Sequence, residues 1–281
     1  MNQKILLTIC LASVFLISQL LRLFPDGKLH LYFCDVGQGD GIYLRTPKGT
    51  DILIDGGPDE KILQCLSDKM LPFDNRIEII FLTHKQSDHL TGLLAVLEKY
   101  QVGELIDSAD NHENKLTQIW EKSIKTSGIK RTVVVDDQAV VIKDGVVLDL
   151  LWPPQDYFPT EPNGFSTNIK LSFNLFTGLF TGDLGSNEQN ILLNKKRQQI
   201  ADLTVLKISH HGSNKDLHKE FIQVISPDIS VISVGKNSYG HPGKDVLQFL
   251  KSLSVKVFRT DQNGTIEVET DGKTYRVETE K

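Results

Sequence analysis

Short apolar runs alternate with helix-like patterns along most of this chain, and histidine and aspartate side chains follow several of the runs. Residues 77–82 are almost all apolar and predict a buried strand, and the leucines of residues 90–97 repeat at the spacing of a helix. His84, Asp88 and His89 lie between these two patterns. The sequence therefore predicts an α/β domain that gathers two imidazoles and a carboxylate where a strand gives way to a helix.

Three further apolar runs end in the same way. Asp183 follows the second run, the adjacent His210 and His211 follow the third, and His241 closes the fourth. Five of the eight histidines thus stand at predicted strand ends, where open α/β sheets place their ligand sites. Unrelated surface histidines are not expected to collect there, so these residues predict one shared site.

Mixed imidazole and carboxylate donors are the ligands that Zn²⁺ and Mn²⁺ accept. Such an ion lowers the pKa of water that it binds, which makes hydrolysis possible near neutral pH. We therefore expect one or two ions of Zn²⁺ or Mn²⁺ per chain. A single pair such as His84 and His89 is more often ordinary surface chemistry, and the prediction depends on the four runs together.

These motifs resemble those of the metallo-β-lactamase superfamily, and within it the extracellular hydrolase-like domain of the competence DNA-uptake protein ComEC and its free-standing relatives. The resemblance covers residues 28–277 and rests on the order of six segments: Phe33–Asp40, Ile52–Gly57, His84–Gly92, His210–Ser213, Gly240–Pro242 and Arg259–Gly264. It implies a four-layer αβ/βα sandwich and a metal-dependent hydrolase, with DNA as the substrate class.

The resemblance also implies a set of metal ligands. His84 and position 86 would serve a first metal site, Asp88 and His89 a second, and Asp183 would bridge the two. Position 86 is Gln86, where the superfamily has His and the ComEC branch often has Asp, and residues 166–169 contain no histidine. The first site is therefore short of donors, and occupancy by one ion stays open.

The roles of the later histidines also stay open. Neighbouring residues leaving a strand point to opposite faces, so we expect one of His210 and His211 to face the metal and the other to lie behind or beside it. By resemblance, Asp88, His210, His211 and His241 are the candidate catalytic residues. Either histidine of the pair can be a metal ligand or a general acid. His241 can be a metal ligand, a phosphate contact or a turn residue beside proline.

The glycine-rich segment 35–40 is followed by a hairpin pattern and not by a helix, which argues against a phosphate-binding loop. We expect Asp40 to support a metal-bound histidine, and Asp55 to have an architectural role. Neither of them, nor Asp35, is predicted to bind metal directly. Residues 152–164, rich in proline and acid, lie between two β-rich halves and predict a loop near the mouth of the site, with a plain surface connection favoured over a substrate loop.

Residues 5–24 are mostly apolar, long enough to cross a bilayer, and not followed by a signal-peptidase site. We expect an uncleaved anchor over residues 1–25 and one hydrolase domain over residues 26–281, outside the cytoplasm at the cell membrane. The alternative is a cleaved signal and a secreted protein. Cys34 and Cys65 fall in a predicted strand and helix and are expected to be buried thiols, not a disulfide.

The sequence therefore predicts a membrane-anchored phosphodiesterase or nuclease, and the resemblance implies DNA as its substrate and a DNA-uptake channel as a candidate partner. A net charge of −5 does not indicate a nucleic-acid-binding protein, but metal ions supply local positive charge. The alternatives are a hydrolase of a cell-wall or lipid phosphodiester, and a non-catalytic partner with an eroded metal site. Gln86 keeps the last alternative open.

Overall fold

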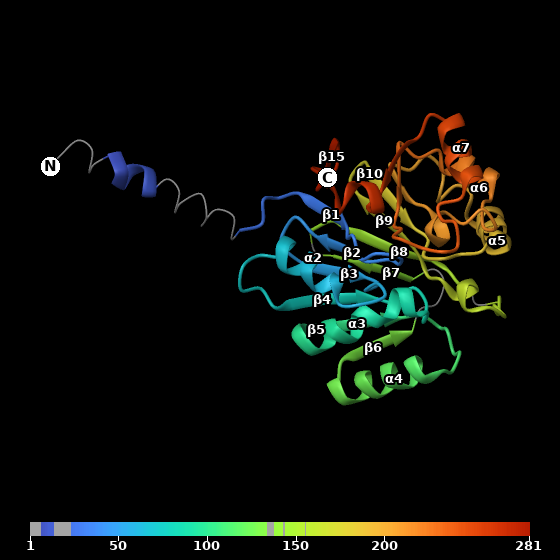
Figure 1. Ribbon diagram of the computed structural model, residues 1–281, viewed down its shortest axis with the longest axis horizontal. Helices are drawn as coiled ribbons and strands as arrows, with labels where there is room; N and C mark the ends of the chain where they lie inside the picture. The colour runs from blue at the N-terminus through green and yellow to red at the C-terminus, as the bar shows by residue number, and fades with distance from the viewer. Residues whose placement is uncertain (1–6, 14–23, 134–137, 143, 155) are drawn as a thin grey trace.

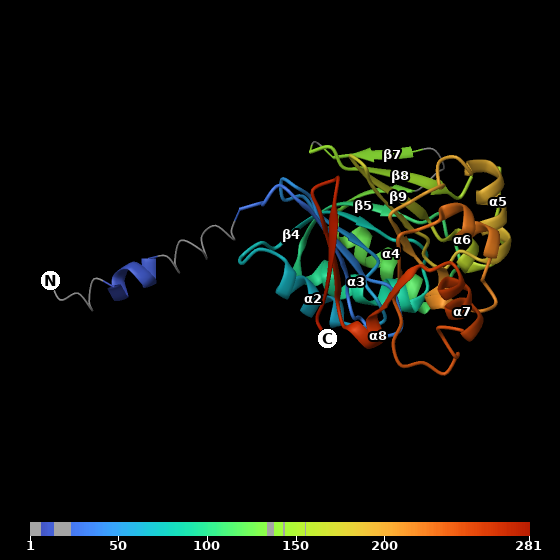
Figure 2. The ribbon, with the colours of Figure 1, turned by 90° about the horizontal axis from the view of Figure 1, so that it is seen from above.

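The computed structural model describes residues 7–13, 24–133, 138–142, 144–154 and 156–281. Two β-sheets face each other, and helices cover the outer face of each sheet, as the two views in Figures 1 and 2 show. This is the four-layer αβ/βα sandwich that the family resemblance implied.

The first sheet has eight strands in the order β15-β14-β1-β2-β3-β4-β5-β6. The strands β3 to β6 are parallel, and the others pair antiparallel. Their bounds are β1 (Leu29–Phe33), β2 (Ile42–Arg45), β3 (Asp51–Ile54), β4 (Arg76–Phe81), β5 (Gln101–Asp107), β6 (Lys130–Val133), β14 (Ile266–Thr270) and β15 (Tyr275–Thr279).

The second sheet has seven strands in the order β13-β12-β11-β10-β9-β8-β7. Here β10 to β13 are parallel, so their carboxyl ends meet at one edge of the sheet. The bounds are β7 (Gln138–Val141), β8 (Val147–Trp152), β9 (Asn168–Phe173), β10 (Phe176–Phe180), β11 (Val205–Lys207), β12 (Ile229–Ile232) and β13 (Lys256–Arg259).

Helices α2 (Lys61–Lys69), α3 (Ser87–Lys99) and α4 (Lys115–Ser127) pack on the first sheet. Helices α5 (Ser186–Lys196), α6 (Lys219–Ile225) and α7 (Lys244–Ser252) pack on the second. Three short elements complete the described chain: η1 (Pro162–Phe165), η2 (Ser209–Gly212) and α8 (Thr260–Asn263).

The core follows from alternation along the strands. In β3, Ile52 and Ile54 point between the sheets, whereas Leu53 points toward the helices. Phe81 and Phe180, which end β4 and β10, also pack between the sheets. The period of two that predicted strands therefore also assigns side chains to the inner and outer layers.

The expected membrane segment, residues 5–24, lies largely outside the described residues. Residues 7–13 within it are helical and exposed. Among the described residues, no helix is long and apolar enough to cross a membrane.

The prediction of free thiols was wrong, because Cys34 and Cys65 form a disulfide with a Cα–Cα distance of 5.9 Å. Cys34 follows β1, Cys65 lies in α2, and both are buried in the layer between the first sheet and its helices. Periodicity predicts that each cysteine is buried, but it carries no information about which buried side chains meet.

Candidate metal centre

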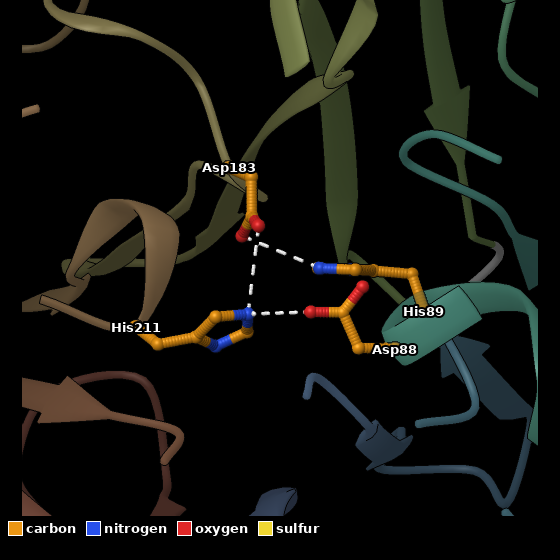
Figure 3. Close-up of side chains that lie close together, drawn as sticks. All are labelled: Asp88, His89, Asp183 and His211. Carbon is orange, nitrogen blue, oxygen red and sulfur yellow. Dashed lines mark hydrogen bonds and ion pairs between the residues drawn. The ribbon is translucent and has the colours of Figure 1, made fainter. Parts of the chain in front are cut away.

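Four side chains bring their ligand atoms together at the edge where the two sheets meet. One atom each from Asp88, His89, Asp183 and His211 lies within 4.8 Å of all the others. The Nε2 atom of His211 is 3.2 Å from Asp88 Oδ2 and 3.4 Å from Asp183 Oδ2, and the Nε2 atom of His89 is 3.3 Å from Asp183 Oδ1 (Figure 3). Two carboxylates and two imidazoles therefore converge on one point.

Strand ends and one helix start bring these residues together. Asp88 and His89 lie in the first turn of α3, directly after β4, while Asp183 follows β10 and His211 follows β11. The start of α3 is held against the loop after β3 by close backbone packing, since a Cβ atom at Gly92 would overlap the carbonyl oxygen of Gly56. Glycine at both positions therefore allows His89 to approach the strand ends.

A hydrogen bond at Nδ1, on the side of the ring away from Asp183, orients the imidazoles of His89 and His211. The Nδ1 atom of His89 donates to Asp55 Oδ2 at 2.7 Å, and the Nδ1 atom of His211 donates to the carbonyl of Ser233 at 2.8 Å. Asp55 also accepts hydrogen bonds from the backbone and the hydroxyl of Thr83. In this tautomer the Nε2 lone pairs point at Asp183, which is the usual arrangement behind metal-binding histidines.

Several buried atoms at this point have no hydrogen-bond partner among the described residues. They are His84 Nε2, His89 Nε2 and both carboxylate oxygens of Asp183. Buried polar atoms are normally paired, and an ion or water bound at this point would satisfy these. Nitrogen and oxygen donors in this arrangement fit a divalent cation.

The imidazoles and the Asp183 carboxylate of this group shift one another's pKa values strongly. Burial opposes ionisation, but Asp183 and then Asp55 outweigh it at His89 and raise the pKa of His89 well above its usual value. Asp183 likewise raises the pKa of His211 against the effect of burial. The pKa of Asp183 is held well below its ordinary range, because His211 and His89 outweigh burial there. The two imidazoles and Asp183 thus favour one another's charged forms.

Lys207 was missed by the sequence analysis. It lies on β11, is fully buried, and its ammonium forms an ion pair with Asp40 while donating to the carbonyl of Gly182 at 2.8 Å. Its nitrogen is also 3.8 Å from Asp183 Oδ1. A lysine inside the apolar run 205–208 was the available signal.

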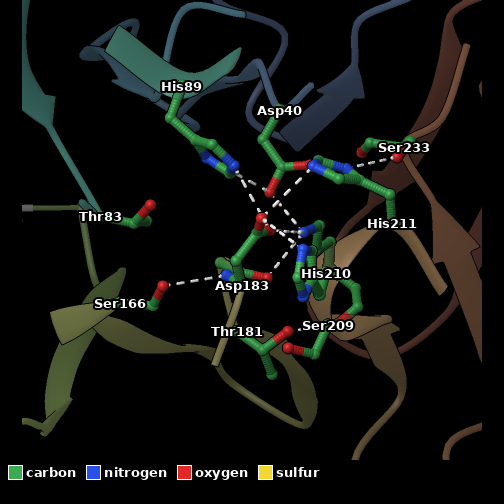
Figure 4. A network of polar contacts seen from close by, with 12 residues as sticks. Asp40, Thr83, His89, Ser166, Thr181, Asp183, Ser209, His210, His211 and Ser233 are labelled. Carbon is green, nitrogen blue, oxygen red and sulfur yellow. Dashed lines mark hydrogen bonds and ion pairs between the residues drawn. The ribbon is translucent and has the colours of Figure 1, made fainter. Parts of the chain in front are cut away.

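Asp40 lies behind the imidazoles, as expected, but its contacts with them are long. Its carboxylate lies between the rings of His89 and His211 (Figure 4), 3.8 Å and 3.5 Å from their Nδ1 atoms. Asp55 is the residue that makes the short hydrogen bond to His89. Asp40 mainly pairs with Lys207, which lowers its pKa against the effect of burial.

His84 and Gln86 lie beside the four-donor group. The His84 ring is buried with its centroid 4.1 Å from that of His89, and burial lowers its pKa to about 4. Gln86 donates from Nε2 to Asn163 Oδ1 at 2.6 Å. Asn163 belongs to η1, so the segment 152–164 lies near the mouth of the site, as predicted, and its end lines the cleft instead of being a plain surface connection.

His210 and His211 do not follow strand alternation. Both have left-handed backbone conformations, with φ of 49° and 52°, inside the short turn η2. As a result both Nε2 atoms approach Asp183 Oδ2, at 3.7 Å for His210 and 3.4 Å for His211. The Nδ1 atom of His210 lies 2.6 Å from Asp216 Oδ2, so an aspartate supports this ring from behind.

The site opens into a cleft of about 820 Å³. Asp88, His210 and His211 line it beside Gln86 and His241. The His241 ring lies edge-on to that of His210 at 5.5 Å between centroids, and burial followed by the neighbouring imidazoles lowers the pKa of His241. All the residues predicted for the site therefore lie at the centre or in its cleft, except that His84 is buried behind it.

The fold and the converging donors define a class of metal-dependent hydrolases. The chain belongs to the metallo-beta-lactamase superfamily, whose model matches residues 34–236. It is 29% identical to ComE operon protein 3 of Bacillus subtilis over 92% of this chain and 35% of that protein. It is 25% identical to competence protein ComA of Neisseria gonorrhoeae over 86% of this chain and 32% of that protein. The resemblance to ComEC-type domains is thereby confirmed.

The chain spans about a third of the length of these curated relatives. Among solved structures it is similar to zinc-bound PqqB from Methylobacterium extorquens, with a TM-score of 0.56, 13% identity, and coverage of 81% of this chain and 87% of that protein. At this identity the likeness shows the fold alone.

Proposed function

We propose that this chain is a metal-dependent phosphodiesterase that cleaves DNA. The observation that carries the proposal is the four-donor group, whose ligand atoms converge at the base of an open cleft and include the unpaired buried atoms of His89 and Asp183. The competence-related names of the relatives support DNA as the substrate.

In this proposal Asp88, His89, Asp183 and His211 hold a divalent cation, either Zn²⁺ or Mn²⁺. The ion supplies Lewis acidity, which stabilises negative charge on the phosphoryl oxygens and promotes the ionisation of water. Asp55 and the Ser233 carbonyl keep the two imidazoles in the required tautomer. A second, weaker ion would have only His84 Nε2 and an oxygen of Asp183 as strong donors.

His210 is the candidate general acid. Its ring is about a quarter exposed to the cleft, and Asp216 holds its Nδ1 atom at 2.6 Å, which leaves Nε2 available to protonate a leaving alkoxide. His241, next along the cleft, is placed to contact the phosphate.

The test compares hydrolysis of single-stranded DNA and of a simple phosphodiester by the metal-loaded chain and by His210→Ala. We expect His210→Ala to keep its metal and to lose about a hundredfold to ten-thousandfold in rate. His218→Ala is a matched control, because His218 caps α6 outside the cleft, and it should keep the rate. If His210→Ala loses its metal instead, His210 is a ligand, and the assigned role is wrong.

We also propose that the domain lies outside the cytoplasm, anchored by residues 5–24, with a DNA-uptake channel as its partner. The apolar composition of that segment supports this placement. So does the disulfide between Cys34 and Cys65, because disulfides persist in oxidising compartments. Protease added to intact cells should digest the domain, and protection that disappears only after lysis would contradict this placement.

A non-catalytic role is the second candidate, and the pairing of Gln86 with Asn163 favours it. These two amides hydrogen-bond to each other beside the four-donor group, and an amide oxygen is a weaker metal ligand than an imidazole or a carboxylate. If the metal-loaded chain hydrolyses neither substrate, this role replaces the enzyme. If it hydrolyses only the simple phosphodiester, a cell-wall or lipid phosphodiester replaces DNA.

A further inference from the structure

One wall of the cleft presents an aromatic side chain that the proposed chemistry does not use. Tyr239 is 75% exposed, although it belongs to an otherwise well-packed domain. Among the exposed large hydrophobic side chains of the described residues, Tyr239 alone lines the 820 Å³ cleft. We propose that Tyr239 is a stacking platform for a base of a single-stranded nucleic acid, an inference that rests on the proposed phosphodiesterase function.

A row of rings connects Tyr239 to the metal centre. The Tyr239 ring lies 5.8 Å from the His241 ring, which lies 5.5 Å from the His210 ring. His210 Nε2 is in turn 3.7 Å from Asp183 Oδ2. A base on the open face of Tyr239 therefore places the neighbouring phosphate beside His241 and His210, next to the point where the four donors converge.

The loop that carries Tyr239 is fixed in place by one side chain. Asn237 donates to the carbonyls of Gly235 and His241 at 2.9 Å and 2.8 Å. Its oxygen accepts from the backbone amides of Tyr239 and His241 at 3.1 Å and 3.0 Å. Four hydrogen bonds thus hold the loop before any ligand arrives, so a base binds without a large entropic cost of ordering.

The position of Lys236 suits a phosphate backbone. It is exposed, precedes Asn237 in the same loop, and lines the cleft. Its ammonium supplies an electrostatic contact that does not depend on sequence, and Tyr239 adds a contact that every base can make. In a duplex the bases are already stacked on one another, so this combination favours an unpaired strand.

The proposal is tested by binding, separately from hydrolysis. Fluorescence anisotropy with the full chain in a metal chelator would compare a mixed-sequence single-stranded oligonucleotide with an abasic oligonucleotide of the same length. We expect Tyr239→Ala to bind the base-containing strand about 5- to 150-fold more weakly and the abasic strand unchanged. Tyr239→Phe keeps the ring and should bind like the wild type.

Two further variants complete the design. Lys236→Ala should weaken both strands alike and lower the salt dependence of binding by about one ion. Tyr275→Ala removes a tyrosine from β15, outside the cleft, and should change neither affinity. Because Tyr239 is mostly exposed, its variants should unfold at the temperature of the wild type.

The proposal is overturned if Tyr239→Ala binds the base-containing strand as tightly as the wild type, or loses affinity equally for the abasic strand. It is also overturned if the wild type binds neither strand. Hydrolysis of the simple phosphodiester by the metal-loaded wild type is measured in parallel. That activity can persist when the stacking platform fails, so the two failures are distinguishable.

Discussion

Replacing Asp55 tests directly whether a hydrogen bond behind the metal centre contributes to metal affinity. Its carboxylate is fully buried and accepts from His89 Nδ1 at 2.7 Å, from the Thr83 amide at 2.8 Å and from the Thr83 hydroxyl at 2.7 Å. In Asp55→Asn, the side-chain oxygen can accept from His89 only if the NH₂ group takes the other position. That NH₂ group then faces the backbone N–H of Thr83, which is also a donor. One buried donor then loses its acceptor, which costs about 1–3 kcal/mol of stability.

The loss of the charged partner should also weaken the metal site. Removing the group that orients a metal-bound histidine typically lowers affinity about 10- to 100-fold, equivalent to ~1.4–2.8 kcal/mol. Competition with a chromophoric chelator measures this affinity directly. The expected result is weaker binding of Zn²⁺ by a folded protein.

Asp51→Asn is the matched control. Asp51 is an equally buried aspartate at the other end of β3, bonded to Tyr43 and Arg45 and about 13 Å along the strand from Asp55. The Asp51→Asn variant should be less stable than the wild type and should keep the metal affinity of the wild type. If Asp55→Asn binds metal within twofold of the wild type, or no more weakly than Asp51→Asn, the orienting role is refuted.

Three further predictions follow from other features. Replacing Cys34 and Cys65 by alanine opens a crosslink between positions separated by 31 residues and should cost about 3–4 kcal/mol of unfolding free energy in denaturant titrations; no loss would mean that the thiols are unpaired. Gln86→His should raise the metal content per chain from one ion toward two in elemental analysis, and two tightly held ions in the wild type would contradict the account of that position. Neighbouring carboxylates raise the pKa values of His89 and His211, so metal binding at neutral pH should release protons and weaken as pH falls. Calorimetry in buffers of different ionisation enthalpy measures this proton release, and finding none would contradict the prediction.

The strands and helices could be predicted from the sequence because burial has a period, whereas the four layers were implied by the resemblance to the metallo-β-lactamase superfamily. Residues 52–54 have the apolar character of a buried strand, and the leucines of residues 90–97 have the spacing of a helix. The disulfide could not be predicted in this way. Cys34 and Cys65 were correctly assigned to burial, but their contact depends on how α2 packs against the end of β1.

The sequence predicted which residues form the candidate site better than it predicted how they are arranged. Polar residues after apolar runs identified Asp88, His89 and Asp183, because strands of both sheets end at the same side of the sandwich. The arrangement of His210 and His211 required backbone conformations that alternation does not describe.

Two contributors were missed for different reasons. Asn163 lies in a proline-rich connection whose path depends on tertiary packing. Lys207 is a buried charge whose main ion-pair partner, Asp40, comes from the opposite half of the chain.

The central claim is that one metal centre built on Asp183 carries out phosphodiester hydrolysis. The most direct test measures metal content and the hydrolysis rate together, in the wild type and in Asp183→Ala. We predict that metal-loaded wild type hydrolyses the diester and that Asp183→Ala loses both metal and rate. Hydrolysis that persists in Asp183→Ala, or metal-loaded wild type with no rate above that variant, would contradict the account.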